Sequence, residues 1–397
     1  MTGPVLALDV AENLLLADEL ATLFTDPPLV LEPADLTYPD NSIGDADVRA
    51  AIATLWNETC GLSGPFRLAA DHVVCTPGAS AALYFHGVVR LQPGQSVIIP
   101  SPYWNNFERV YKRIEAPLVR MPVNETAASQ VDLDTLKHLH GQLQAEGRPP
   151  GLLLLTNPHN PLGIVESREQ LATILDWAIA STDMDVVVDE IYAHTLYGSS
   201  PFVSVMQLEQ SLAHPERIHS VWGFAKDFGL SGWMAGVLFT RSARLVKTIS
   251  GGYARFSPFD KLKSRVMRRL LLEGVGGKSA RELLQLFDNR LRTLRDAVAD
   301  RLRAHGIPFR EQAEGAPFFW LDVRAWLPDS VNGIEAEAAL QKMIAEQARV
   351  SLVKGQALYK DEPGYLRLCF TAAAPDAVLA AVDRLGVFLE QTRSTSG

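Results

Sequence analysis

Hydrophobic positions in the first 240 residues fall into two alternating patterns. The runs at 152–155, all leucine, and 186–188, all valine, are apolar without alternation, as in strands that are covered on both faces. Between such runs, apolar residues recur every three or four positions, which is typical of amphipathic helices. The pattern predicts an α/β fold: a large domain with a mostly parallel central sheet flanked by helices, and functional residues where the strands end. Strands are expected at 72–76, 96–100, 117–121, 151–156, 185–189, 219–222 and 236–240, and helices at 47–58, 80–91, 105–114, 132–143 and 167–180.

The C-terminal part has a different pattern. Two long charged helices are expected at 258–273 and 277–305, followed by strands at 318–323, 350–353 and 365–370 and helices at 334–348 and 375–392. This mixture indicates a smaller α+β domain. Helix-like leucine spacing and then prolines in residues 1–36 indicate an N-terminal arm that joins it. We therefore expect an arm at 1–36, a large domain at 37–270 and a small domain at 271–397.

Composition narrows the possible partners. The 397 residues are 47% apolar and 21% charged, as in ordinary folded proteins. A net charge of −9 gives no attraction to nucleic acid or to anionic membranes. Cys60, Cys75 and Cys369 are scattered and have no metal-ligand spacing, so neither a disulfide framework nor a metal site is expected. Without a targeting signal or a membrane-length apolar run, we expect a cytoplasmic location.

One lysine stands out for its surroundings. Lys226 lies in a glycine-rich, otherwise apolar loop between two expected strands. A charged ammonium is costly there, so the side chain tends toward the neutral amine, which makes it a candidate to form an imine. A lone lysine in a loop more often reaches out to solvent. The other strand ends therefore decide its interpretation.

Four strand ends carry polar residues toward the same crevice. The turn at 77–80 opens a helix whose amides suit a phosphate, although Ser80 also fits a plain helix cap. Trp104 can stack on a planar ring or simply pack. Two Asn-Pro steps at 157–161 form a rigid loop that offers side-chain amides. Asp189 ends a buried strand and needs a partner, such as a protonated ring nitrogen, unless it caps the next turn.

Taken together, these segments resemble a known superfamily over nearly the whole chain. The residues at 157–163 (NPHNPLG), 189–192 (DEIY) and 226–230 (KDFGL) resemble, in order and spacing, the fold-type I pyridoxal-phosphate enzymes of the aspartate aminotransferase superfamily, class I/II. Within it, the chain is most similar to the 1-aminocyclopropane-1-carboxylate (ACC) synthase group, whose members act on S-adenosylmethionine. The segments that carry this second resemblance are 11–13, 38–44, 201–206 and 362–370.

The resemblance implies pyridoxal 5'-phosphate (PLP) as cofactor and gives each residue a role around its ring. Lys226 would form the imine and transfer the α-proton, and Asp189 would pair with the ring nitrogen. Tyr192 would donate to the phenolate oxygen, Asn160 would support that edge, and Trp104 would stack on the ring.

It also implies how phosphate and substrate are held. Gly78, Ala79 and Ser80 would bind the phosphate, and Tyr38 would reach the phosphate of a second subunit, which implies a homodimer with shared active sites. Arg367 would clamp the substrate carboxylate, next to Asn160. Glu12 would face the sulfonium side of the substrate, or else be a glutamate that is favoured at a helix start.

Two positions depart from the family pattern. Gly223 and Met234 stand where relatives usually have a serine and an arginine on the cofactor phosphate. Another cation such as Arg255 replaces them, or cofactor binding is weaker, or the pocket is wider for an unusual ligand.

The expected function follows from the resemblance. We expect a PLP enzyme that acts on an α-amino acid through a quinonoid intermediate, with γ-elimination or γ-replacement on S-adenosylmethionine or a similar substrate, with or without capture by a second substrate. The alternative is an aminotransferase that uses an amino acid and a 2-oxo acid. A third hypothesis, a PLP-dependent sensor or inactive scaffold, is disfavoured because Lys226, Asp189 and Arg367 are all retained.

Overall fold

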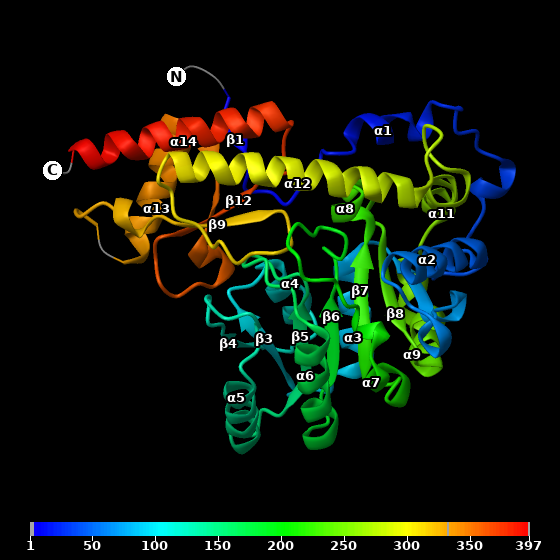
Figure 1. Cartoon of the computed structure of the whole chain (residues 1–397). Coiled ribbons are helices and arrows are strands. Elements are labelled where there is room, and N and C mark those ends of the chain that lie inside the picture. The colour runs from blue at the N-terminus through cyan, green and yellow to red at the C-terminus, as the bar shows by residue number, and fades with distance from the viewer. Residues whose placement is uncertain (1–3, 332, 396–397) are drawn as a thin grey trace.

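A seven-stranded sheet lies at the centre of the large domain (Figure 1). The computed structural model describes residues 4–331 and 333–395. The strands lie in the order β2-β8-β7-β6-β5-β3-β4, and only β8 runs antiparallel to its neighbours. They are β2 (Val73–Thr76), β3 (Ser96–Ser101), β4 (Leu118–Pro122), β5 (Pro150–Thr156), β6 (Asp185–Asp189), β7 (Ile218–Gly223) and β8 (Gly236–Thr240). The mostly parallel sheet expected from the sequence is confirmed.

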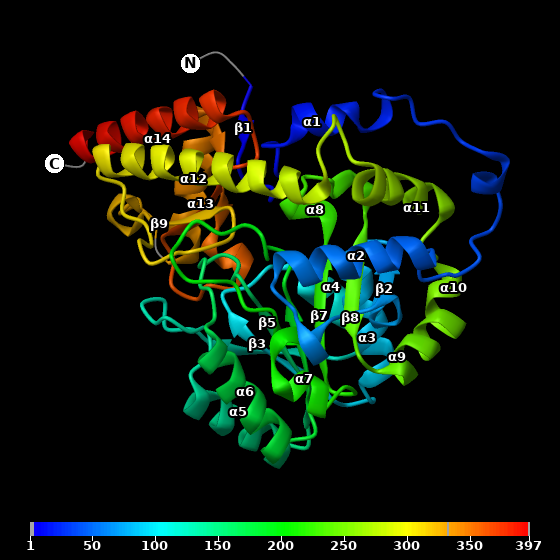
Figure 2. The ribbon, with the colours of Figure 1, turned by 45° about the vertical axis from the view of Figure 1, so that its right-hand side comes forward.

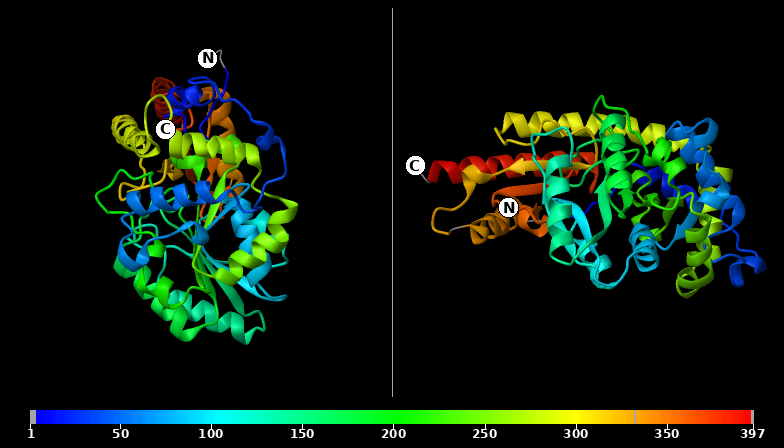
Figure 3. Two further views of the ribbon diagram at one scale, coloured as in Figure 1. Left: turned by 90° about the vertical axis from the view of Figure 1, so that its right-hand side faces the viewer. Right: turned by 90° about the horizontal axis from the view of Figure 1, so that it is seen from below.

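Both faces of this sheet are buried, which explains the unbroken apolar runs. Leu153 and Leu155 of β5 belong to one hydrophobic core, whereas Leu152 and Leu154 belong to another on the opposite face. Helices flank the sheet on both sides (Figure 3). The helices that follow these strands or pack near them are α2 (Ala46–Thr59), α3 (Ala79–Arg90), α4 (Asn106–Lys112), α5 (Leu133–Ala145), α6 (Arg168–Ser181), α7 (Glu209–Ala213), α9 (Ala243–Thr248), α10 (Ala254–Phe256) and α11 (Lys261–Arg268).

The C-terminal part, together with the N-terminal strand β1, forms two small sheets and three main helices in the described residues. The antiparallel sheet has the order β11-β12-β9, and a parallel pair joins β1 to β10. The strand expected at 350–353 is thus two strands, which pair in different sheets. Helices α12 and α14 lie side by side (Figure 1). The elements are β1 (Leu6–Ala7), β9 (Phe318–Asp322), β10 (Val350–Ser351), β11 (Val353–Lys354), β12 (Tyr365–Cys369), α12 (Ala280–Ala304), α13 (Ile334–Met343) and α14 (Pro375–Thr395).

The N-terminal segment runs from the small sheets across α12 to the large domain (Figure 2). Its strand β1 pairs with β10, and its short helix α1 (Ala17–Ala21) is held to α12 by two contacts between Arg290 and Glu19, at 2.7 and 2.8 Å. The domain boundaries at 36 and 270 stay predictions. No described helix has the length and apolar character that crossing a bilayer requires.

Candidate active site

A cavity of about 500 Å³ lies where the carboxyl ends of the strands meet the arm and β12. The ends of β5 and β6, the starts of α3 and α4, and a one-turn helix, α8 (Phe224–Asp227), all contribute to its wall. Most of the residues expected at the site line it: Gly78, Ala79, Ser80, Trp104, Asn160, Asp189, Tyr192, Lys226 and Arg367. The topology therefore brings together residues that are almost 300 positions apart in the chain.

Lys226 lies in α8 rather than in an irregular loop. The turn is closed by hydrogen bonds from Phe224 N to Ala235 O (3.1 Å) and from Leu230 N to Phe224 O (3.1 Å), with the Phe224 ring buried. The Lys226 Nζ donates to the main-chain oxygen of Ala11 in the arm. Burial lowers the pKa of Lys226, against the opposing charge of Glu12. The geometry thus favours the neutral amine that imine chemistry requires.

Asp189 is a buried carboxylate that no cation pairs with in the described part of the chain. Its Oδ1 accepts from Ile191 N at 3.2 Å. Burial raises the pKa of Asp189 to about 7, although this hydrogen bond and the charge of Lys226 act in the opposite direction. A protonated ring nitrogen in the cavity would supply the missing partner. Its neighbour Glu190 is instead held by Ser204 Oγ at 2.8 Å and Val205 N at 2.7 Å, as a structural group.

A chain of polar contacts connects Tyr192, Asn160 and Arg367. Asn160 Nδ2 lies 3.5 Å from Tyr192 Oη, and Arg367 Nη1 donates to Asn160 Oδ1 at 2.9 Å. Arg367 Nη2 donates to Asp9 O at 2.8 Å, while its Nε has no partner. Burial lowers the pKa of Arg367, which has no carboxylate within ion-pair distance among the described residues. A desolvated, unpaired guanidinium that faces a cavity suits a ligand carboxylate.

The start of α3 forms the other end of the cavity. Gly78 caps this helix with φ 93°, and Ala79 and Ser80 are its first residues. The first-turn amides of a helix have no partner within it, so they are available to a phosphate. Gly236 of β8 packs so closely that a Cβ there would lie 2.2 Å from the carbonyl carbon of Gly78. Trp104 lines the cavity and packs edge-on against Phe107 at 5.3 Å.

The two departures from the family pattern have different surroundings. A Cβ at Gly223 would lie 2.8 Å from Ala235 O, so no side chain fits there. Met234 is left-handed (φ 50°) and lines the cavity, with its Cε 3.2 Å from where a Gly78 Cβ would be. Arg255 is exposed and does not line the cavity. The charged groups in the described lining are Asp9, Asp189, Lys226 and Arg367, so no described cation other than Lys226 and Arg367 lines the cavity.

Two expected site residues lie outside this cavity. The carboxylate of Glu12 accepts from Ser231 Oγ at 2.6 Å and does not line the cavity, although its charge acts on Lys226. Tyr38 is 95% exposed and makes no contribution to the cavity of its own chain. Their assigned roles stay predictions.

The sequence reasoning missed the main-chain contribution of the arm. The carbonyls of Asp9 and Ala11 accept from Arg367 and Lys226, and Asn13 Nδ2 donates to Lys226 O at 2.7 Å. The motif at 11–13 indicated this segment. Contacts made by main-chain oxygens, however, do not depend on residue type and cannot be recognised in the sequence. Val10, Leu358 and Val353 add an apolar wall.

A separate buried cluster lies at the opposite ends of the strands. His86, Asp185 and His219 have the spacing of a metal-ligand set. Arg90, however, already binds both oxygens of Asp185, at 2.7 and 2.9 Å. Burial alone would raise the pKa of Asp185, but the hydrogen bonds from Arg90 and the neighbouring His86 ring, 3.4 Å away, bring it down to about 2. The cluster thus contains a strong ion pair.

The family follows from a comparison of sequences. The family model for aminotransferase class I and II matches residues 29–385. The chain belongs to this family. Enzymes of the family depend on PLP, and the cavity fits that group at each end: helix amides for phosphate, an unpaired Asp189 for the ring nitrogen and a buried Lys226 for the aldehyde. The protein is therefore a PLP-dependent enzyme.

Individual relatives divide between two named activities. ACC synthase 3 of Oryza sativa subsp. japonica is 28% identical over 86% of this chain and 77% of its own length. A mouse (Mus musculus) protein named ACC synthase-like protein 1 is 29% identical, over 92% of this chain and 72% of its own. The probable aminotransferase ACS12 of Arabidopsis thaliana is 26% identical, over 99% of this chain and 80% of its own.

Solved structures show the same fold. An aromatic aminotransferase from Pyrococcus horikoshii has a TM-score of 0.77 at 22% identity, covering 99% of this chain and 97% of that one. A double mutant of aspartate aminotransferase from Thermus thermophilus has a TM-score of 0.76 at 22% identity, covering 97% and 92%.

Proposed function

We propose that this PLP enzyme acts like an ACC synthase, with γ-elimination or γ-replacement on S-adenosylmethionine or a similar α-amino acid. The observation that carries the proposal is the arm, whose residues 9–13 contact both Lys226 and Arg367. The resemblance of the arm to ACC synthases and the relatives of that name support it.

The side chains have distinct tasks in such a reaction. Arg367 binds the substrate carboxylate and so fixes the Cα next to Lys226. The neutral Nζ of Lys226 then accepts the α-proton. Bound PLP supplies an electron-withdrawing ring that stabilises the negative charge left at Cα, and Asp189 holds the proton on the ring nitrogen. Tyr192 and Asn160, which lie 3.5 Å apart, would hold the edge of the bound ring.

The bond changes balance on the substrate itself. The electron pair that the α-proton leaves behind forms a bond from Cα to Cγ, and the Cγ–S bond breaks at the same time. The sulfonium sulfur receives that electron pair and departs as the neutral thioether methylthioadenosine. The proton remains on Lys226 until it is returned to solvent or product.

Product analysis tests this proposal. Purified holoenzyme incubated with S-adenosylmethionine should release methylthioadenosine, detected by mass spectrometry, and Lys226→Ala should abolish the release. Wild-type enzyme that releases none would contradict the proposal.

A second candidate is transamination, because one relative, whose match covers 99% of this chain, is named a probable aminotransferase. In that case an amino donor and a 2-oxo acid should yield a new amino acid, which the same mass spectrometry detects. A donor panel that yields new amino acids, together with no methylthioadenosine, would favour this candidate.

We further propose a cytoplasmic homodimer in which Tyr38 reaches the cofactor phosphate of the partner. The support is the exposure of Tyr38 together with apolar neighbours on the same segment and on α10: Val30 at 66%, Leu36 at 78% and Phe256 at 92%. Apolar surface of this kind is typical of an interface. Light scattering should show a dimer, and Tyr38→Phe should weaken PLP binding. A fully active monomer would contradict this.

A further inference from the structure

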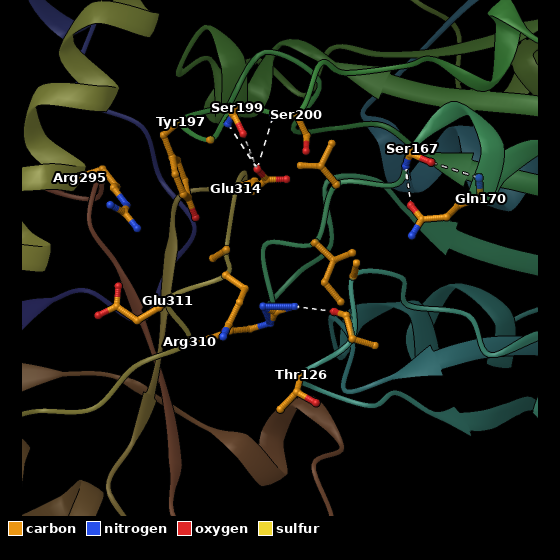
Figure 4. Close-up of a pocket in the computed structure, with 17 residues that line it drawn as sticks. Thr126, Ser167, Gln170, Tyr197, Ser199, Ser200, Arg295, Arg310, Glu311 and Glu314 are labelled. Atoms are coloured by element: carbon orange, nitrogen blue, oxygen red, sulfur yellow. Dashed lines mark hydrogen bonds between the residues drawn. The ribbon is translucent and has the colours of Figure 1, made fainter.

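A second cleft, of about 590 Å³, lies between the large domain and the C-terminal part (Figure 4). Residues near 126–128, 164–170 and 197–200 form one wall, and residues 310–314 with Arg295 of α12 form the other. The loop at 157–165 separates this cleft from the active site. Asn160 of that loop lines the active-site cavity, whereas Ile164 and Val165 line the cleft.

Buried arginines that lack a carboxylate partner indicate where an anionic ligand would bind. Four arginines are less than a tenth exposed in the described chain: Arg49, Arg269, Arg310 and Arg367. The first two have carboxylate partners, Asp71 and Glu273 respectively. Arg310 and Arg367 have none within ion-pair distance among the described residues. Each lines a cavity. Because a buried, unpaired cation is costly, each of these two indicates an anionic ligand.

The guanidinium of Arg310 has N–H groups that make no hydrogen bond. Its Nη2 donates to Ala127 O at 2.8 Å, a contact that crosses the cleft (Figure 4). Its Nε and Nη1 are buried and have no partner in the described structure. Burial lowers the pKa of Arg310, against the nearby charges of Glu125 and Glu314. The guanidinium is thus satisfied through only one of its three nitrogens.

The rest of the wall is compatible with an anion. Arg295 lies over the Tyr197 ring at 5.1 Å, and its Nε is also without a partner. The two acids of the wall, Glu311 and Glu314, already accept hydrogen bonds from other residues. Glu314 Oε1 accepts from Ser199 N and Ser200 N, both at 3.3 Å, and Glu311 is bound by Arg303 at 2.7 Å.

We propose that this cleft is a second ligand site, which binds a small molecule through an oxyanion, a carboxylate or a phosphate, with Arg310 as the principal cation and Arg295 as the second. A bound oxyanion would join residues 126–128 of the large domain to Arg310. Since Gly163 O already accepts from Glu314 N at 2.8 Å, the ligand would act on the loop that carries Asn160.

Calorimetric titration of the PLP-loaded enzyme tests the site. The two probes are inorganic phosphate, which tests for a phosphate ligand, and citrate, which tests for a carboxylate ligand. Wild-type enzyme should bind at least one of them, and Arg310→Gln should weaken that binding about tenfold or more, because a charge-assisted hydrogen bond is lost. Arg281→Gln, which removes an exposed positive charge on the same helix as Arg295, should leave the affinity unchanged.

The active site must be separated from the cleft in this test. Arg367→Gln should keep the binding, since Arg367 lies in the other cavity. The proposal would be overturned if the wild type bound neither probe, or if Arg310→Gln bound a probe as tightly as the wild type. It would also be overturned if Arg367→Gln lost the binding while Arg310→Gln kept it. If Arg310→Gln does not fold, Arg295→Gln is used in its place. Its affinity for the probe should be weaker than that of the wild type, and an unchanged affinity would contradict the proposed site.

Discussion

Replacing Asp189 by asparagine should have opposite effects on the cofactor-free and the cofactor-loaded protein. Without PLP, Asp189 is a buried carboxyl that has one hydrogen bond, at 3.2 Å, and no cationic partner among the described residues. With PLP bound, the protonated ring nitrogen would become that partner, as we propose for Asp189. Asp189→Asn should therefore stabilise the empty protein and weaken its hold on the cofactor.

The size of the first effect follows from the pKa. Burial raises the pKa of Asp189 from its ordinary 3.8 to about 7. Below pH 3.8 the carboxyl is protonated in both folded and unfolded chains and costs nothing. Between the two values only the unfolded chain ionises, so stability falls as pH rises, by about 1.4 kcal/mol per pH unit. The full penalty is about 4 kcal/mol above pH 7, and about 3 kcal/mol of it develops between pH 5 and pH 8.

Urea unfolding of the two cofactor-free proteins, at one protein concentration and at several pH values from 5 to 8, measures this. The advantage of Asp189→Asn should grow with pH and level off near pH 8. In the loaded protein the same change should weaken PLP binding by about tenfold to a hundredfold, because a charge-assisted hydrogen bond is lost.

Asp227 provides the matched control. Burial raises its pKa to about 7 as well, but its oxygens accept from Trp222 Nε1 at 2.8 Å and Thr195 Oγ1 at 2.9 Å. Asp227→Asn places an amide against these donors and should destabilise the protein at pH 5. An Asp189→Asn protein that is no more stable than wild type at pH 8, or a pH-independent difference, would refute the reasoning.

Three further substitutions separate binding from stability. Arg367→Gln should raise the dissociation constant of an amino-acid substrate by about tenfold to a hundredfold, while PLP affinity is unchanged, by spectral titration. Asp185→Asn should lower the free energy of unfolding by about 2 kcal/mol, because it leaves Arg90 without its carboxylate, while kcat is unchanged. Gly223→Ser should cost about 1–3 kcal/mol of stability without tightening PLP binding, and tighter binding would contradict the packing argument.

The parallel core could be predicted from the sequence because each strand there is a short apolar run with polar ends. The predicted bounds of β6 (Asp185–Asp189) and β8 (Gly236–Thr240) agree with the structure. The turn of helix at Lys226 could not be predicted from the sequence, because contacts with Ala235 and with the arm define it. The division of 350–353 between β10 and β11 likewise depends on tertiary pairing: β10 pairs with β1 near the N-terminus, whereas β11 pairs with β12, the next strand along the chain.

The grouping of the site residues could be predicted for a related reason. Asn160 follows the end of β5 and Asp189 is the last residue of β6, and these neighbouring parallel strands end at the same edge of the sheet. The arm has no such constraint. Glu12 was expected either to face the sulfonium side of the substrate or to be a helix-start glutamate, and its role stays a prediction. Its carboxylate accepts from Ser231 Oγ at 2.6 Å, while Asp9 and Ala11 of the same segment line the cavity. Side-chain direction in an irregular segment depends on packing that the sequence pattern does not encode.

The unusual phosphate end has a physical consequence for assembly. Gly223 has no room for a side chain, and Met234 presents a thioether beside Gly78 instead of a cation. On its own chain, the phosphate would then be held by the amides and hydroxyl at the start of α3, where the helix dipole contributes roughly half a charge. We propose that the exposed Tyr38 of a second copy supplies a further donor. Because two subunits would then share one phosphate, cofactor affinity and dimer formation would be linked. Dilution that separates the subunits would also weaken PLP binding.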